Sequence, residues 1–499
     1  MNVRYSIHGI PNDMVTSEFI GKRRFKVSGD SQKTAFGQLV TAQDTPLVQI
    51  TAQYGLLSGV STVALGGTTT TENSKFIANS GASSTGVSAI ISSRQVKHRV
   101  GQGLKGMFTA IFSTGQTGSF QQAGLISSDV SFAFGYDDQS FGVLYAKDGQ
   151  LEIQNLAITT PASGESATVT VDGVAYTIPL SSGTIDLNAY EVAAYLTLNE
   201  PRYDATSNGG IVTLRARLPD FGGGAFAFSS SNAIASWSQI VAAALPVEIW
   251  TPQTSWNIES KLEFNPALLN IYMIQFESLA GSVKFYMQDP VTSDMTLVHV
   301  IRYTNTSTLP IVPEAVYRVG WANRNRGNTT NTITQGTSAA IMIEGEIALN
   351  TAPSADSFLQ SSIGTQSTNV LSLRNRTVFN TKSNRTDIYP QKAFLFTESA
   401  KTAIFDIIID ATVPSGDLLA WDYYDNALST AEVAKNSVLI TGGTTVASIA
   451  VSPSSPREVD LRDIINELPS FSSLTICARL AANGSASDMG VSFNWIEDK

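Results

Sequence analysis

The chain has 499 residues, of which 42% are hydrophobic. Only 15% are charged, against about 25% in an average soluble protein. The formal net charge of −10 argues against a general phosphate-binding surface, which would have to be basic. Ser, Thr, Asn, Gln and Gly carry the polar share, and these short side chains suit strands and turns better than helix surfaces. The length predicts about three domains and the composition favours a mainly β class.

Residues 1–33 are polar and are interrupted by Pro11 and Gly21. We interpret them as an N-terminal anchoring arm that docks on a neighbouring subunit. A solvated leader is the alternative, and the basic run is too short to favour a nucleic-acid arm. The basic residues of this arm are Lys22, Arg23, Arg24 and Lys26.

Two separated segments, 34–150 and 249–350, show apolar residues at every second position between turn-rich stretches. Alternation with period two indicates half-buried strands, and short strands at regular spacing are typical of a β-sandwich. Asp148-Gly149 adds a hairpin signal. We therefore predict one discontinuous β-sandwich built from both segments.

The segment between them, 151–248, has a different pattern. A hairpin is expected around Asp172-Gly173, followed by a helix for which Asp186 can act as the N-cap. Further strand patterns follow the helix. This order predicts a small α+β module inserted into the sandwich.

Residues 351–369 have the polar composition of a connector, and we predict a linker there. Residues 370–499 contain six strand candidates and predict a second, C-terminal β-sandwich of jelly-roll-like character.

No catalytic, cofactor or metal constellation is visible in the sequence. The three histidines, His8, His98 and His299, lie far apart, whereas a zinc site needs grouped ligands. The single cysteine, Cys477, has apolar neighbours and predicts a buried thiol. Neither a secretory signal nor an apolar stretch of about 18 residues occurs, so we expect folding in a reducing cytoplasm, with no membrane insertion.

Two clusters are candidates for binding. The stretch WDYYDN could present a stacking platform for sugar rings, although strand-end aromatics are more often core or subunit interface. The Asn-rich loop around Trp321 is a candidate intersubunit contact because Arg and Trp are favoured at interfaces, and a solvated loop is the alternative. The residues concerned are Trp421, Tyr423 and Tyr424 in the first cluster and Arg318, Trp321, Arg324 and Arg326 in the second.

Four stretches are similar to structural proteins of tailed bacteriophages. TAFGQLVTAQDTPLVQITAQYG (34–55) resembles their opening segment, although Gln38-Leu39-Val40 lacks an Arg of that pattern. NIYMIQFESLAGSVKFYMQDP (270–290) resembles their central strands. VLSLRNRTVFNTKSNRTDIYP (370–390) and VSFNWIEDK (491–499) resemble the start and end of their C-terminal sandwich.

This resemblance implies a non-enzymatic virion component, placed on the tail or neck as a fibre, spike or adaptor. Its partners would be other virion proteins and copies of itself, with a homotrimer as the first expectation. The alternatives are a capsid decoration or minor capsid protein, and a glycan-binding module that recognises a host surface. A glycan depolymerase is disfavoured because no long repetitive β-helix pattern occurs. The nearly uncharged segment 34–56 would add a strand to a sheet or to a neighbouring copy through main-chain hydrogen bonds.

Overall fold

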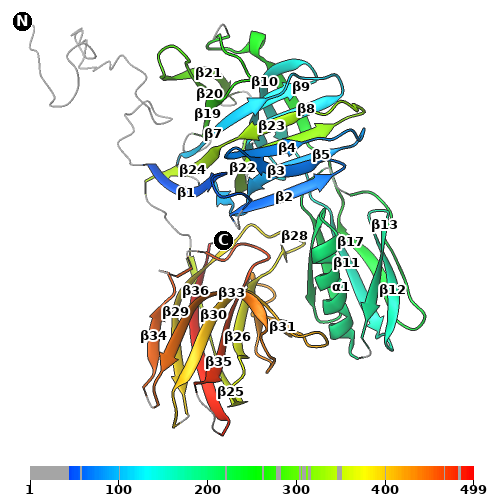
Figure 1. The fold of residues 1–499 in the computed structure, drawn as a ribbon, viewed down its shortest axis with the longest axis vertical. Helices are drawn as coiled ribbons and strands as arrows, with labels where there is room; N and C mark the ends of the chain where they lie inside the picture. The colour runs from blue at the N-terminus through cyan, green and yellow to red at the C-terminus, as the bar shows by residue number, and fades with distance from the viewer. Residues whose placement is uncertain are drawn as a thin grey trace, which may run out of the picture.

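The computed structural model describes residues 44–56, 59–99, 102–181, 183–219, 222–260, 263–276, 282–302, 305, 311–312, 316–345, 351–398, 400–453, 455–462, 464–465, 467–481 and 485–498. The described chain is mainly β, as predicted, and holds one α-helix. The predicted N-terminal arm, 1–33, lies outside the described residues, and so does His8. Figure 1 shows three β-rich bodies, which we name the first sandwich, the inserted unit and the C-terminal sandwich.

The first sandwich consists of two antiparallel sheets that enclose an aromatic core. Phe134 and Tyr272 face each other across this core with ring centroids 4.8 Å apart. The nine-stranded sheet comprises β21 (Met295–Arg302), β20 (Ser282–Gln288), β19 (Asn270–Phe276), β7 (Leu104–Phe112), β23 (Ile333–Gly336), β4 (Lys75–Asn79) and β3 (Thr68–Glu72), with β24 (Ser338–Glu344) on β7 and β1 (Asp44–Thr51) on β24. The eight-stranded sheet comprises β18 (Val247–Pro252), β10 (Ser140–Lys147), β9 (Ser131–Asp137), β8 (Ser119–Ile126), β22 (Val316–Asn325), β5 (Val87–Ser92) and β2 (Val60–Leu65), with β6 (Val96–Lys97) on β22.

Strand β1 is the described part of the uncharged segment that was expected to add to a sheet. It pairs antiparallel with β24 of the same chain, in a register that places Gln49 opposite Ala340. Asp44 receives a hydrogen bond of 2.7 Å from Lys105, whose side chain is buried. Main-chain pairing and one ion pair therefore fix this strand within its own sandwich.

The inserted unit packs one helix against two small sheets. Helix α1 (Ile185–Asn199) is capped by Thr184, whose hydroxyl accepts a hydrogen bond of 3.2 Å from the Leu187 N–H. The predicted N-cap, Asp186, is wrong: it lies in the first turn, where a carboxylate is still favourable. The sheets comprise β14 (Tyr203–Asn208), β15 (Ile211–Ala216), β11 (Ile153–Thr160) and β17 (Ile234–Val241), and β13 (Val174–Leu180), β12 (Glu165–Val171) and β16 (Ala227–Ser229).

The turn between β12 and β13 confirms the predicted hairpin. Asp172 and Gly173 both have positive φ, at 49° and 81°, as a two-residue type I′ turn requires.

The C-terminal sandwich buries a second large core between two sheets. Residues 351–363 form β25, which pairs along its length with β36, so the predicted linker at 351–369 is wrong. A Ser- and Thr-rich stretch fits an edge strand as well as a connector, and only the pairing partner decides. The sheets comprise β25 (Thr351–Ile363), β36 (Ser487–Asp498), β29 (Asp387–Thr397) and β34 (Arg457–Asp460), and β31 (Trp421–Tyr423), β32 (Ala431–Ala434), β26 (Thr368–Asn375), β35 (Ser473–Leu480), β30 (Ala403–Thr412) and β33 (Gly442–Val451). A short hairpin is formed by β27 (Val378–Phe379) and β28 (Lys382–Ser383).

Cys477 is buried in this sandwich, as predicted. Its Sγ lies 2.9 Å from the Ser367 hydroxyl, and burial raises the pKa of the thiol.

Ion pairs join the first sandwich to the C-terminal sandwich. Arg94 Nη2 donates to Glu467 Oε2 at 2.6 Å, and Arg99 Nη2 donates to Asp498 Oδ2 at 2.5 Å. The carboxylates of both pairs are largely buried. Removing one partner of such a pair leaves an uncompensated buried charge, so these contacts favour one fixed arrangement of the two bodies. A third pair joins Arg385 to Asp129.

The same interface makes stability depend on pH. Burial first, and then the nearby Glu467, raise the pKa of Asp387 well above its usual value, while Arg94 opposes the shift. The folded chain thus keeps a proton that the unfolded chain releases near pH 4, so the free energy of unfolding should fall as the pH rises from there. Asp387→Asn should flatten this fall, by up to about 1.4 kcal/mol per pH unit, in urea titrations between about pH 4 and pH 8. Asp460→Asn, at a half-exposed carboxylate, is the control. Parallel pH profiles for wild type and Asp387→Asn would contradict the assignment.

Candidate functional site

Trp421 does not offer a stacking surface. Its side chain is only 7% exposed, and the Arg374 guanidinium lies over its ring at 4.4 Å. The prediction that Trp421 stacks on a sugar is therefore wrong, because its ring belongs to the packing of the C-terminal sandwich.

Tyr423 and Tyr424 are the aromatic residues of this cluster that reach solvent. Tyr423 is 46% exposed, and the Arg376 guanidinium covers one side of its ring at 4.9 Å. Tyr424 is 37% exposed and donates its hydroxyl to the Ala355 carbonyl at 3.0 Å. The Tyr423 ring is thus held by Arg376 on one side and partly open to solvent. Tyr424, in contrast, anchors the loop to β25 through its hydroxyl.

The carboxylates beside these tyrosines have different roles. Asp425 accepts hydrogen bonds from the backbone N–H groups of Ala427 and Leu428, at 2.9 and 3.0 Å, and so shapes the turn. Asp422 is exposed and lines a cavity of about 80 Å³. Asn208 of the inserted unit also lines this cavity. Asp422 and Tyr423 are consecutive residues of strand β31, so their side chains point to opposite faces. The aromatic face of Tyr423 is therefore the part of this cluster that can receive a polar ring.

The second predicted cluster is divided among three environments, because Arg318, Trp321 and Arg324 lie on strand β22 and Arg326 directly follows it. Side chains alternate between the faces of a strand, so Arg318 and Arg324 point away from the face that carries Trp321. Residue spacing of this kind was visible in the sequence, and it could have separated the arginines from the tryptophan.

Trp321 belongs to the core of the first sandwich. It has no exposed surface, packs on Phe76 with ring centroids 5.3 Å apart, and donates its indole N–H to the Thr109 carbonyl at 2.8 Å. Gly336 is required beside it, since a Cβ there would lie 2.2 Å from the indole ring. The Trp321 side chain is therefore part of the core, and the prediction that it forms an intersubunit contact is wrong.

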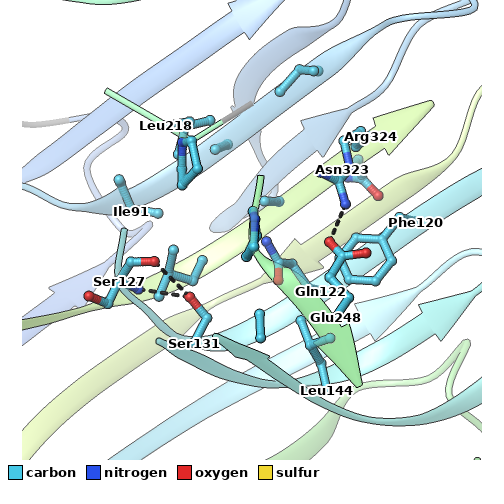
Figure 2. A pocket seen from close by; sticks show the side chains of 17 residues that line it. Ile91, Phe120, Gln122, Ser127, Ser131, Leu144, Leu218, Glu248, Asn323 and Arg324 are labelled. Carbon is cyan, nitrogen blue, oxygen red and sulfur yellow. Dashed lines mark hydrogen bonds and ion pairs between the residues drawn. The ribbon is translucent and has the colours of Figure 1, made fainter. Parts of the chain in front are cut away.

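Arg324 and Arg326 are held by their own chain. Both pair with Glu248 of β18, and their guanidinium groups lie 5.1 and 4.5 Å from the centre of the Phe120 ring. Figure 2 shows Glu248, Arg324 and Phe120 at one side of a small pocket of about 60 Å³, which is lined largely by apolar side chains of the eight-stranded sheet. Arg326 also pairs with Asp137 at 3.1 Å.

The described histidines are packed inside the first sandwich. Burial lowers the pKa of both His98 and His299 to about 4, with Arg302 adding to the shift at His299. His299 is a strand residue, as predicted, and its Nδ1 lies 3.4 Å from the Asn257 N–H. Within the described residues, no group of three His, Cys, Asp or Glu side chains could hold a metal ion. None of the described helices is long and apolar enough to cross a membrane.

No family model matches the chain, and no curated protein matches it. Several solved lectin structures align with it. The Emp47p carbohydrate recognition domain is 7% identical over 60% of this chain and 95% of its own, with a TM-score of 0.26. Lectin II from Ulex europaeus (9% identity, 60% and 100% coverage, TM-score 0.23) and peanut lectin with a nine-residue peptide (10% identity, 62% and 100% coverage, TM-score 0.25) are comparable. Scores this low carry no argument about ligand or mechanism.

Proposed function

We propose that this chain is a non-enzymatic structural component of a tailed-phage virion, associated with the tail or neck, which works by holding other subunits in position. The four phage-like stretches support this proposal, and so does the multi-sandwich architecture. The main supporting observation is that buried polar contacts tie the three bodies together.

The inserted unit and the C-terminal sandwich share such contacts. Arg374 donates to the Ser207 carbonyl at 2.8 Å and to Glu432 Oε2 at 2.8 Å. Asn208 of the inserted unit donates to the same carboxylate at 2.6 Å. Glu432 is buried, so breaking this triangle would leave a desolvated charge. Together with the ion pairs between the first and the C-terminal sandwich, these contacts suit a structural protein that must hold its neighbouring subunits at a fixed distance.

Strand β33 supplies an edge for assembly. It is the last strand of the six-stranded sheet, pairs only with β30 among the named strands, and carries no charged residue and no proline along GGTTVASIAV. Edge strands without such protection are open to strand addition by another chain. A register shift opposite Ile407 and Ile408 interrupts the edge and would limit pairing to its regular part, 447–451.

Quantitative mass spectrometry of purified particles tests the proposal. Tens of copies or fewer per particle are expected for a tail or neck part, and hundreds would favour the capsid alternative. Absence of the chain from particles would contradict both. Sedimentation of the isolated chain should show self-association, because the unpaired edge of β33 can add a strand from another copy. The mass of a single chain would count against a homo-oligomer.

A second candidate function, glycan binding, is favoured by Tyr423. A half-exposed ring supported by Arg376 is a suitable surface for a sugar ring. On a glycan array, any sugar bound by the wild type should be bound about 2- to 12-fold more weakly by Tyr423→Ala, since one aromatic contact contributes about 0.5–1.5 kcal/mol. Tyr54→Ala is the matched control, because Tyr54 is 71% exposed in the first sandwich. No binding by the wild type would exclude this function.

A further inference from the structure

A cavity lies where the three bodies meet. Its volume is about 370 Å³, and residues from the first sandwich, the inserted unit and the C-terminal sandwich all line it. The hairpin strand β28 of the C-terminal sandwich reaches toward the other two bodies here (Figure 1). Ligand sites commonly lie at such domain junctions and have volumes of roughly 300–1,000 Å³.

The charge that lines this cavity is unbalanced. Asp204 accepts hydrogen bonds from Arg215 at 2.8 Å and from Arg217 at 2.9 Å. Although burial opposes the shift, these two arginines lower the pKa of Asp204, which is therefore an anion. Two carboxylates pair with the arginines of this cavity, Asp204 in the lining and Asp129 outside it, which leaves an excess of two positive charges; the arginines are Arg215, Arg217, Arg318 and Arg385.

Arg318 is the arginine without a counter-ion. Among the described residues, no hydrogen bond or ion pair to its guanidinium is found, although the residue is half-buried. Burial first, and then Arg215 and Arg217, lower the pKa of Arg318 to about 10, so it stays charged at neutral pH. Asp204 and Asp387 oppose this shift; Asp204 is already paired with Arg215 and Arg217, and the raised pKa of Asp387 weakens its contribution.

Hydroxyl groups complete the polar lining. Ser383 and Ser470 lie at 3.5 and 3.2 Å from Arg215 Nη1, and Ser93 and Ser127 line the side formed by the first sandwich. A guanidinium fork and several hydroxyl donors are the groups that bind an oxyanion, because two parallel N–H donors match the geometry of a carboxylate, sulfate or phosphate.

We propose that this cavity binds one small oxyanion, carrying a carboxylate, sulfate or phosphate group, with Arg318 as the principal donor. The ligand supplies the negative charge that the protein itself lacks at this junction. Since donors come from all three bodies, the bound anion also fastens the bodies to one another. This site is independent of the virion role and of Tyr423.

Isothermal titration calorimetry tests the site, with inorganic phosphate, sulfate and glucuronate as probes at constant ionic strength, and glucose as the uncharged control. We expect saturable binding of at least one anion with one site per chain. Arg318→Gln should weaken that binding roughly 10- to 100-fold, as expected for a lost hydrogen bond to a charged group. Arg318→Lys should retain part of the affinity, and Arg462→Gln, at an exposed arginine remote from the cavity, should bind as the wild type does.

Hydrogen exchange with and without the anion locates the ligand. Protection should rise together in β22, in residues 211–217 and in residues 382–385, which belong to three different bodies. Tighter binding of phosphate or of glucuronate identifies a phosphorylated or an acidic-sugar source, and either outcome supports the proposal. Failure of all three anions to bind the folded wild type overturns it, as does unchanged binding by a folded Arg318→Gln. If Arg318→Gln does not fold, Arg318→Lys and the protection pattern decide.

Discussion

Replacing Arg202 by methionine should lower the free energy of unfolding of the inserted unit by about 3–5 kcal/mol, the usual cost of removing one partner from a buried ion pair. Arg202 donates to Glu200 at 2.6 and 2.8 Å and to Asp172 at 3.0 Å, and its remaining donors reach the Val171 carbonyl. Glu200 is fully buried. Without Arg202, the one side-chain partner left to Glu200 among the described residues would be the Tyr176 hydroxyl, at 2.8 Å.

The effect should depend on pH in a defined direction. Burial raises the pKa of Glu200, but the hydrogen bonds from Arg202 and Tyr176 outweigh burial and hold this pKa below its usual value. A carboxyl with a depressed pKa stabilises the fold above the pKa of the unfolded chain, about 4.3, and loses this contribution as the pH falls through its folded pKa. The difference between wild type and Arg202→Met should therefore shrink in acid.

Hydrogen exchange of peptides from 151–248 measures this change within one body of a protein that need not unfold in a single step. Arg462→Met is the matched control, because Arg462 pairs with Asp460 at the surface and should cost no more than about 1 kcal/mol. Equal losses for the two variants would show that burial of the Arg202 pairs does not matter.

Replacing Trp321 by alanine should destabilise the first sandwich by about 3–5 kcal/mol, the usual range for deleting a buried aromatic side chain. The deletion leaves a void against Phe76 and Gly336 and removes the donor to the Thr109 carbonyl. Trp321→Phe keeps most of the ring and should cost clearly less. Urea unfolding followed by hydrogen exchange of 316–325 measures both.

Tyr54→Ala, at an exposed aromatic residue of the same body, should change stability by less than about 0.5 kcal/mol. A Trp321→Ala protein as stable as the wild type would mean that the indole is not core but surface, as the sequence-based interface hypothesis held.

The sequence-based prediction placed several side chains on the wrong surface for one physical reason. Arg318, Trp321, Arg324 and Arg326 are near one another along the chain and read as one patch, but a strand sends alternate side chains to opposite faces. In the same way, Trp421 and Tyr423 read as one platform until Arg374 is seen to cover the first ring. Proximity along the chain does not determine which atoms share a surface.

By itself, the sequence determined the mainly β class, the helix at 185–199, the hairpin at Asp172-Gly173 and the buried state of Cys477. These depend on local patterns: alternation, turn residues and apolar neighbours. Only the tertiary structure decided that residues 351–363 form a strand, that Trp321 is core, and that Arg215, Arg318 and Arg385 face one cavity. Such features depend on which distant segments pack together. Whether a buried charge is paired is decided by neighbours that lie hundreds of residues away in the chain.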